Sequence, residues 1–500
     1  MGVISNIYLI IFLPLISSLF CQIFSKKNYS FWIAFCSCLA TFFLVLKIFP
    51  DVLTYETIGN DFELSLLSIA LEFRLDLLGS IFLLLLIFLK IVILFFYRTD
   101  IENTLDKKNS HIFYSVFLLN LFALVGIFTT NNLLNLFLFF EIYSFSFFAN
   151  LSISRETELL KLAFRYFCLN VTSSLLVLFS FFAIYLTFGE TNFDKIAENL
   201  SLVSVSNLWF SALIFGLLAV AFLIKFFPFW LYFYKLKSGS LIANFLAIDS
   251  LFIKTNIGIF LILKFVYFFF GNHLLFVNFN FSPILILLAI LLIFYSVFKL
   301  CSQKHLKIIA AYFCLNNLGF ILAGIALQNT ESLQAVFFYL LNFSFVNLLI
   351  FIFATFLKRY FKTSSINKIW IIRKSHFSLV LPIKLLIFFI AGFPLTILFF
   401  ANWYLAYASF KLGFEAFLLV GLVLSSFANV VVVLKLISSF FANQQSEKFL
   451  EMPQLSFKKH QFYFISFWFL IVTIYAITLA SSFTNTLSLK FASYLLSNTI

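Results

Sequence analysis

Fourteen apolar runs follow one another along this chain, and each is long enough to cross a lipid bilayer as a helix. The runs are continuous rather than alternating, which favours helices over barrel strands. A soluble protein of 500 residues could not cover its core with only 11% charged residues, so the sequence predicts an all-α polytopic membrane protein. The expected spans are residues 3–24, 31–50, 75–97, 111–129, 131–153, 161–188, 206–231, 241–270, 281–300, 305–327, 333–358, 379–408, 412–441 and 461–483.

The positions of the basic residues predict how the spans alternate. If each span reverses direction, one side of the membrane receives the basic loops, and the other side receives only Arg74, Lys195, Lys411 and Lys490. Basic loops stay on the cytoplasmic or matrix side, so both termini are expected on the opposite, outer face. The basic loops lie at residues 26–27, 98–108, 155–161, 235–237, 304–307, 358–374 and 448–459.

Two loops and the first span carry patterns of their own. The acidic loop 51–73 is expected on the outer face, and its weak alternation suggests a hairpin. The basic loop 358–376 is a candidate amphipathic surface segment. The run from Val3 has no basic segment before it and no small-residue cleavage site after it, so we expect a retained span.

Composition and motifs exclude several kinds of function. The net charge of +13 is spread over short loops, with no basic segment dense enough for nucleic acid. The six cysteines form no C-x-x-C pair, which argues against iron–sulfur or zinc sites. No G-x-x-x-x-G-K-[S/T] motif is present for ATP. The five histidines fall in loops or at span ends, away from where a b-type haem needs its ligands. We therefore expect no cofactor, no metal site and no catalytic chemistry in this chain.

Three ionisable residues lie near the expected midplane of their spans: Glu141, Lys225 and Lys254. A charge at that depth costs roughly 2.5–3.5 kcal/mol on insertion scales, and snorkelling cannot carry it to water. Such groups usually pair with one another or line a hydrated path. A carboxylate beside an ammonium lowers the desolvation cost of both groups, and each can take up or release a proton when its partner moves. The pattern therefore predicts an ion pathway with Glu141 and Lys225 within salt-bridge reach.

Other charges inside the spans leave two interpretations open. Asp249 shares the eighth span with Lys254. Lys384 and Lys435 lie near span ends, where a lysine chain can reach the headgroups along the helix. Lys90 and Lys264 lie deeper, and for them snorkelling and a functional role are both open.

Two spans are interrupted by proline. Pro228 follows Lys225 in "AFLIKFFPFW", and Gly392 and Pro394 interrupt "FFIAGFPLTILFFANW". Proline in a membrane helix frees a backbone carbonyl, and broken helices beside charges recur at transporter sites. The two breaks lie five spans apart, which suggests an internal repeat of five helices. Two unrelated kinks are the alternative.

Several of these stretches together resemble a known family. "TNNLLNLFLFFEI" looks like the segment around the buried glutamate of D subunits of Mrp-type multisubunit cation/proton antiporters, and less closely like the antiporter-like subunits of respiratory complex I. "KLAFRYFCLNVTSS", "AFLIKFFPFW", "LAIDSLFIKTNIGIFLILK" and "QKHLKIIAAYFCLNNLGFILAGI" are similar to later helices of the same family, and "RLDLLGS" and "IAGFPL" also fit. The resemblance covers roughly residues 70–440 and is specific as an ordered series of motifs.

The resemblance implies a fold and a set of roles. The family fold has fourteen helices with two inverted five-helix repeats, each containing one broken helix. Glu141 matches the glutamate of the family's proton path, Lys225 matches its partner, and Lys254 matches the lysine that links the two half-channels. The implied divisions are an N-terminal three-helix segment with an outer loop (1–110), a first antiporter-like half (111–270), a second half (281–441), and a C-terminal loop and last helix (442–500).

The sequence departs from the family pattern mainly in its second half. Phe343 and Asn347 stand in "NFSFVN" where the family usually has His and Lys, and Asn402 stands where it carries a charge after the second broken helix. His305 replaces the usual Asp, and the segment after Lys225 is shortened. The first half-channel therefore keeps its charges, while the second has lost them. Asp249, His305 and Lys307 are candidate auxiliary groups.

Three functions are weighed on this basis. The favoured one is a D-type subunit of a monovalent cation (Na⁺ or K⁺)/proton antiporter, which works beside other membrane subunits in a bacterial cytoplasmic membrane. The second is an antiporter-like proton-pumping subunit of an NADH:quinone oxidoreductase, with a mitochondrial inner membrane as the alternative location. The third is a structural membrane subunit with a degenerate second half-channel, supported by Asn347 and Asn402.

Overall fold

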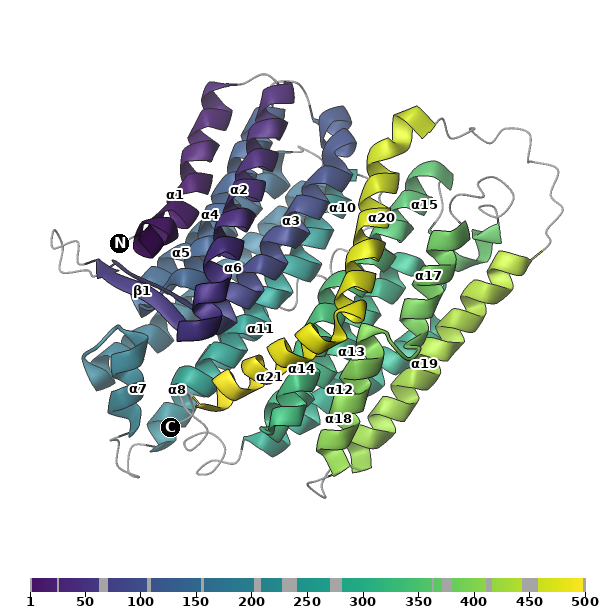
Figure 1. Ribbon diagram of the computed structural model, residues 1–500. Helices are drawn as coiled ribbons and strands as arrows, with labels where there is room; N and C mark the ends of the chain where they lie inside the picture. The colour runs from purple at the N-terminus through teal and green to yellow at the C-terminus, as the bar shows by residue number, and fades with distance from the viewer. Residues whose placement is uncertain are drawn as a thin grey trace. The chain divides into compact units, whose positions relative to one another are not determined.

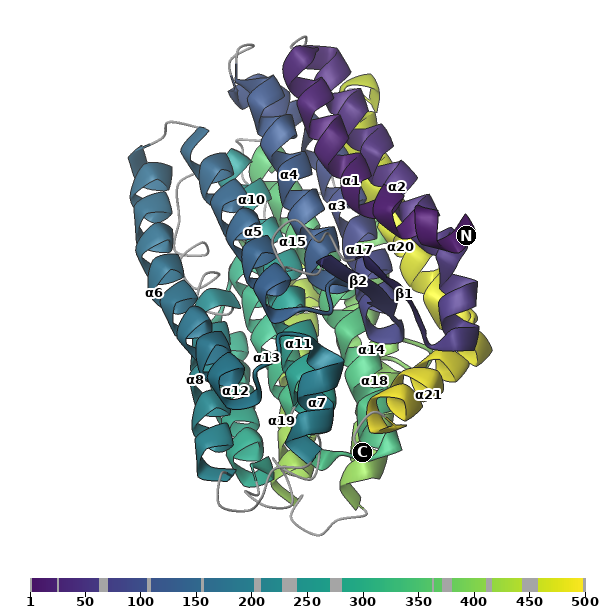
Figure 2. The same ribbon diagram turned by 90° about the vertical axis from the view of Figure 1, so that its left-hand side faces the viewer.

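The chain is helical almost throughout the part that the structure describes, and its helices form two compact units, Met1–Phe279 and Asn280–Leu496. In each unit long helices run side by side (Figure 1, Figure 2). The computed structural model describes residues 2–24, 27–62, 71–105, 109–153, 157–201, 208–226, 241–269, 281–361, 364–370, 380–410, 416–442 and 457–497.

The first unit is a helical bundle with a small hairpin. Its helices are α1 (Gly2–Ile23), α2 (Lys27–Tyr55), α3 (Leu77–Thr104), α4 (Ser110–Thr129), α5 (Leu133–Ile153), α6 (Thr157–Phe188), α7 (Phe193–Ser201), α8 (Leu208–Phe226), α10 (Leu241–Ile248), the π-helix η2 (Asp249–Lys254), α11 (Thr255–Lys264) and the π-helix η3 (Phe265–Phe269). Phenylalanine rings fill its interior: Phe82, Phe128 and Phe260 join α3, α4 and α11, with ring centroids 4.4–6.0 Å apart. Aromatic pairs at this spacing add to the stabilisation from buried area.

The second unit is a second helical bundle. Its elements are α12 (Ser282–Ser302), α13 (Leu306–Leu327), α14 (Thr330–Leu341), the π-helix η5 (Asn342–Val346), α15 (Asn347–Phe361), the 3₁₀ turn η6 (Ile366–Lys368), α17 (Val380–Ala391), α18 (Ile397–Phe410), α19 (Ala416–Phe441), α20 (Phe457–Leu479) and α21 (Ser481–Ser497). The turn around η6 packs beside the loop before α13, because Leu306 N donates to Ser364 O at 3.0 Å and Ile366 N donates to Lys304 O at 2.8 Å.

Every expected span contains one or more helices among its described residues. Among the described residues, ten helices are long and apolar enough to cross a membrane. The first, seventh and twelfth expected spans contain the shorter apolar helices Ile7–Ile23, Gly216–Phe226 and Ile397–Phe410. The fourteenth belongs to a helix pair bent by 77°, Phe467–Leu479 and Ser482–Ser497. The all-α polytopic membrane fold is thus confirmed.

The outer acidic loop contains the expected hairpin. Strands β1 (Thr57–Phe62) and β2 (Leu71–Asp76) pair antiparallel, with Thr57 opposite Asp76 and Phe62 opposite Leu71. Asp76 then ends β2 and caps α3, because its Oδ1 accepts a hydrogen bond from Gly79 N at 2.6 Å. An aspartate at this position satisfies a helix N–H that has no partner within the helix.

The helix α21 was not expected from the sequence. Its residues are less apolar than those of the spans, so its pattern does not stand out. It packs against α14: Gln334 Nε2 donates to Ser488 Oγ at 3.2 Å, and the rings of Phe337 and Phe491 lie 5.6 Å apart. Figure 1 shows α21 turning sharply away from the direction of α20.

The second proline break is present in the structure. Helix α17 ends at Ala391, Gly392 and Leu395 have positive φ angles of 68° and 71°, and α18 begins at Ile397. Pro394 lies between them, in the break. The first expected break, at Pro228, lies outside the described residues, as do residues 362–363 and 371–376 of the candidate amphipathic segment.

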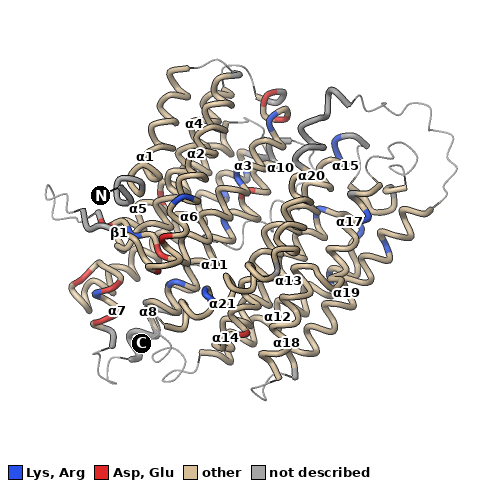
Figure 3. The backbone as a smooth tube through the Cα atoms, viewed as in Figure 1, with Lys and Arg blue, Asp and Glu red and all other residues tan. Residues whose placement is uncertain are grey.

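The faces of several helices are apolar and exposed. On α6, for example, Phe164 is 67% exposed and Leu175 is 62% exposed. Figure 3 shows that charged residues occupy little of the helix length. Apolar exposure on this scale fits a hydrocarbon environment, since in water it would favour association.

Candidate functional site

The first unit holds a largely buried ion pair between α5 and α8. Glu141 Oε1 on α5 lies 2.8 Å from Lys225 Nζ on α8, and the side chains are 19% and 0% exposed. Ser174 on α6 joins the pair: its hydroxyl donates to Glu141 Oε1 at 2.6 Å and accepts from Lys225 Nζ at 2.9 Å. The expected contact between Glu141 and Lys225 is confirmed. Three helices thus meet at one charge-neutral group of hydrogen bonds.

Lys254 lies in a second buried site. Its side chain is fully buried at the end of η2, and Nζ donates to the hydroxyl of Tyr166 at 2.9 Å. The same ammonium lies 4.1 Å from the centre of the Tyr166 ring and 5.5 Å from that of Phe147. Aromatic faces stabilise a desolvated cation. Lys254 thus contacts α5 and α6, the two helices that also carry Glu141 and Ser174.

Asp249 belongs to a further buried ion pair. Its Oδ1 lies 3.1 Å from Lys90 Nζ on α3, and the two side chains are 6% and 1% exposed. The hydroxyl of Tyr143 on α5 donates to Asp249 Oδ2 at 3.3 Å. Lys90 also donates to Asn120 Oδ1 on α4 at 2.7 Å. Lys90 therefore does not snorkel; it neutralises a carboxylate at its own depth.

The other lysines inside the spans divide between the two interpretations. Lys264 at the end of α11 is 5% exposed and lies 3.8 Å from Asp76 Oδ2, so it too is paired. Lys384 is exposed on α17, as snorkelling predicts. Lys435 donates to the carbonyls of Cys301 and Gln303 at the end of α12. Lys435 therefore satisfies carbonyls of a helix end rather than reaching along its own helix.

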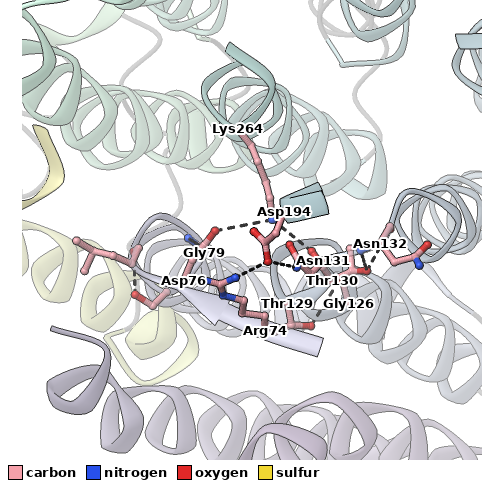
Figure 4. Close-up of polar contacts among 12 residues, drawn as sticks. Arg74, Asp76, Gly79, Gly126, Thr129, Thr130, Asn131, Asn132, Asp194 and Lys264 are labelled. Atoms are coloured by element: carbon pink, nitrogen blue, oxygen red, sulfur yellow. Dashed lines mark hydrogen bonds and ion pairs between the residues drawn. The ribbon is translucent and has the colours of Figure 1, made fainter. Parts of the chain in front are cut away.

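Polar side chains from β2, α7, α11 and the turn between α4 and α5 lie together at one end of the first unit (Figure 4). We call this group the outer cluster. Arg74 on β2 lies 2.5 Å from Asp194 Oδ2 on α7, and Asn131 Nδ2 donates to the same oxygen at 2.8 Å. Lys264 donates to Thr130 O at 3.2 Å, in the turn between α4 and α5. The expected alternation of the spans assigns all these ends to the outer face, and the structure brings them together.

The second unit has polar groups in place of charges. Asn402 Oδ1 on α18 accepts from the hydroxyl of Tyr339 on α14 at 2.6 Å. Asn316 Nδ2 on α13 donates to Ser425 Oγ on α19 at 2.6 Å. Phe343 and Asn347 are buried in η5 and at the start of α15. From residue 281 on, the sequence has no Asp, and its glutamates, Glu331, Glu415, Glu447 and Glu451, all lie outside the helix interiors that we expect in the membrane.

His305 and Lys307 lie at the start of α13. His305 forms an isolated bridge with Ser365, and Lys307 Nζ lies 5.9 Å from the centre of the Phe351 ring. In the second unit both residues thus belong to the end that carries basic loops. Among the described residues, no group of three or more His, Cys, Asp or Glu side chains could hold a metal ion.

The sequence analysis did not identify four residues of these sites, Ser174, Tyr166, Asn120 and Tyr143, and it named Lys90 without assigning its partner. Ser174 and Tyr166 both lie in the quoted motif helix but carry no charge, so nothing marked them out. Lys90 had a signal, because Asp249 needs a cation at its own depth and Lys90 was a deep lysine without an assigned partner. Tyr143 lies two residues after Glu141, and Asn120 shows only its polarity in an apolar run.

Comparison with known protein families identifies the family to which this chain belongs. A family model described as NADH:quinone oxidoreductase/Mrp antiporter, TM, matches residues 130–428, which include Glu141, Lys225 and Lys254. The chain belongs to this family. Lys90 precedes the matched residues.

Individual relatives lie in both branches that the family name joins. NADH-quinone oxidoreductase subunit N of Pelagibacter ubique (strain HTCC1062) is 28% identical over 290 residues, which cover 57% of this chain and 59% of the relative. Putative antiporter subunit mnhD2 of Staphylococcus aureus (strain MRSA252) is 26% identical over 236 residues, 46% of this chain and 45% of the relative. The chain thus spans about half to three-fifths of the length of these relatives.

The fold is shared over the whole chain. A chain in the structure of the Mrp complex from Dietzia sp. DQ12-45-1b superposes with a TM-score of 0.82 at 16% identity, covering 99% of this chain and 98% of that one. At this identity the likeness shows the fold alone. The chain thus belongs to the NADH:quinone oxidoreductase/Mrp antiporter family and shares the fold of a chain of the Mrp complex.

Proposed function

We propose that the first unit carries a proton path in which Glu141, Lys225 and Lys254 exchange protons. The observation that carries this proposal is the buried pair of Glu141 and Lys225, 2.8 Å apart and bridged by Ser174. A buried ion pair is poor evidence for stability, because desolvation offsets most of its attraction. Its presence in a membrane interior supports a role in moving charge.

The chemistry of the path follows from the side chains. In the pair, a proton can pass from the Lys225 ammonium to the Glu141 carboxylate, which leaves a neutral amine beside a neutral acid. Separation of the two then exposes either group to a new partner. Ser174 can both donate and accept, so it keeps its contacts with the pair in either protonation state. Lys254 and the Tyr166 hydroxyl are the next groups able to carry a proton.

We propose a hetero-oligomeric complex as the setting. The resemblance of "NLFLFFEI" to Mrp-type D subunits favours a cation/proton antiporter that moves Na⁺ or K⁺ against protons, together with other membrane subunits, in a bacterial cytoplasmic membrane. The second candidate, a proton-pumping subunit of an NADH:quinone oxidoreductase, is supported by the similarity to subunit N. In that case the redox chemistry lies in other subunits, and a mitochondrial inner membrane is the alternative location.

The third candidate, a structural subunit, rests on the second unit. Asn347 and Asn402 can hold water by hydrogen bonds but cannot change charge. The absence of Asp from residue 281 onward extends this argument beyond those two positions. A transporter that needs two charged half-channels would not work with this chain alone.

Replacing Glu141 by glutamine tests the proposed path. We expect Glu141→Gln to abolish transport, because it removes the acid that exchanges protons while keeping the size of the side chain. The measurement is dissipation of a pH gradient in vesicles that contain the complex copurified with this chain, followed with a pH-sensitive dye after addition of Na⁺ or K⁺. Normal assembly with unchanged transport would reject the path and favour the structural subunit.

The composition of the complex separates the remaining candidates. A tag on this chain, mild detergent and mass spectrometry identify what copurifies. Small hydrophobic antiporter subunits would support the first candidate, and peripheral redox subunits would support the second.

A further inference from the structure

The ion pair of Lys90 and Asp249 lies close to the path residues, but the proposed path does not use it. The pair joins α3 to η2 and is more deeply buried than the pair of Glu141 and Lys225, with side chains 1% and 6% exposed. Lys90 lies near the middle of α3, far from either end of the helix. Two ion pairs in one apolar bundle need an explanation, because each one costs desolvation energy.

The π-helix η2 relates Asp249 to Lys254. The two residues are its first and last, five positions apart. In an α-helix, residues five apart point in directions about 140° from each other, since each residue turns the helix by about 100°. In a π-helix the hydrogen bond runs from residue i to residue i+5, so these two residues lie one above the other on the same side. The extra width of this turn thus turns the carboxylate toward the side of the helix that carries Lys254.

The groups around Asp249 are polar or titratable on every side. Lys90 approaches from α3 and Tyr143 from α5, each within hydrogen-bond distance. Lys254 is the last residue of η2 itself, and its ammonium donates to the Tyr166 hydroxyl on α6. The Tyr166 hydroxyl thus accepts from Lys254, and the Tyr143 hydroxyl donates to Asp249.

We propose that Asp249 is a further proton-carrying residue, which exchanges a proton with Lys254 across the π-helical turn, and that Lys90 is the positioning residue that keeps Asp249 ionised and ready to accept. This proposal rests on the proposed proton path. In the step, an N–H bond of the Lys254 ammonium breaks and an O–H bond forms on the Asp249 carboxylate. A neutral amine and a neutral acid result, and no oxidant or reductant is involved. The charge of Lys90 then favours release of the proton and returns Asp249 to the observed state.

A structural role for the pair makes a different prediction. If Lys90 and Asp249 only hold α3 against η2, a neutral pair of similar size should serve as well, since buried ion pairs can be replaced by uncharged side chains without loss of stability. Loss of one partner alone would leave a buried charge and could prevent folding. The double variant Lys90→Met/Asp249→Asn avoids that difficulty, because it removes both charges together.

The test compares five variants of the tagged complex in vesicles, by copurification of the other subunits and by transport rate over a range of pH. We expect Lys90→Met/Asp249→Asn to assemble normally and to transport about 100-fold more slowly, the scale typical of a lost acid–base group. We expect Lys90→Met alone to move the acid limb of the pH–rate profile to higher pH, because Asp249 then holds its proton more tightly. Lys90→Arg should keep the profile of the native chain.

The matched control is Glu102→Gln. Arg98 and Glu102 form an ion pair on the same helix, α3, with the same distance of 3.1 Å, but they lie near its end. This variant should transport normally. If the double variant transports within about twofold of the native rate while Glu141→Gln is inactive, the pair is structural and Asp249 carries no proton. If Lys90→Met leaves the profile unmoved, the positioning role is wrong. If Glu141→Gln is also active, the proposed path itself fails.

Discussion

At the scale of single residues, three buried carboxylates of the first unit each lie beside a lysine. Glu141 has Lys225, Asp249 has Lys90, and Asp76 has Lys264. Each lysine supplies a positive charge at the depth of its carboxylate, so none of these acids is left uncompensated in a low-dielectric interior. Lys90, Lys225 and Lys264 are thus explained by these carboxylates, whereas Lys254 lies beside the hydroxyl and the ring of Tyr166.

Ser174 offers a residue-scale test of how the central pair is held. Ser174→Ala removes a donor to Glu141 and an acceptor for Lys225. A hydrogen bond to a charged group contributes about 1.5–3 kcal/mol, so we expect transport to be about 10- to 150-fold slower with normal assembly. Ser174→Thr, which keeps the hydroxyl, should retain most of the rate.

The neighbouring Ser173 provides the control. Its hydroxyl donates to the carbonyl of Asn170 within the same helix and does not contact the pair. Ser173→Ala should therefore transport normally. An equal effect of both serine variants would mean that α6 responds to any loss of a hydroxyl, and the special role of Ser174 would be lost.

At the scale of elements, a segment that departs from a regular α-helix positions side chains of the proposed proton path. The π-turn η2 brings Asp249 and Lys254 to one side of their helix. Regular α-helix throughout would satisfy the backbone equally well but would separate these side chains. The break between α17 and α18 has the same kind of irregularity, although the charge expected beside it is replaced by Asn402.

Two substitutions in this break should act in opposite directions. Gly392 has φ = 68°, where a side chain costs about 1–2 kcal/mol, and its added Cβ would lie 3.3 Å from Leu398 Cδ2. Leu395 bears that cost already, with φ = 71°. We expect Gly392→Ala to lower the midpoint of thermal unfolding of the purified complex and Leu395→Gly to raise it. Leu395 is 70% exposed, so its loss removes little packing within the chain. Shifts of the same sign would contradict the assignment of strain.

At the scale of the whole molecule, two units of similar architecture carry different chemistry. The first unit holds the three buried ion pairs, whereas the described part of the second unit relies on asparagine, serine and tyrosine contacts such as Asn316 with Ser425. The fold matches a chain of the Mrp complex over its full length. The two units thus differ in the charge of their buried side chains, although both are helical bundles.

The topology gives a test at this scale. Glu198 on α7 and Asn367 in η6 are both exposed, and the basic-loop pattern assigns them to opposite faces. In a background with Cys36 and Cys168, the exposed cysteines of the described residues, changed to serine, we expect a membrane-impermeant maleimide to label Glu198→Cys but not Asn367→Cys in intact cells. Both sites should label once the cells are permeabilised. The reverse pattern in intact cells would invert the topology.

The sequence by itself determined the spans, the interruption at Gly392 and Pro394, the hairpin and the central pair. These follow from local rules: apolar length sets a span, proline and glycine break it, and a charge at the midplane needs a partner. Glu141 and Lys225 could be matched because few charges compete at that depth and because their motifs resemble a family.

Only the tertiary structure decided the remaining partners. Ser174, Tyr143 and Asn120 are neutral, and a neutral polar residue acquires a role only from the charge that packing places beside it. Lys90 and Asp249 are 159 positions apart, and their meeting depends on how α3 packs against η2. The π-turn depends on the packing around it, because hydrogen bonding from residue i to i+5 has no reliable signature in the order of side chains. Local sequence fixes which helices form, whereas their packing fixes which side chains meet.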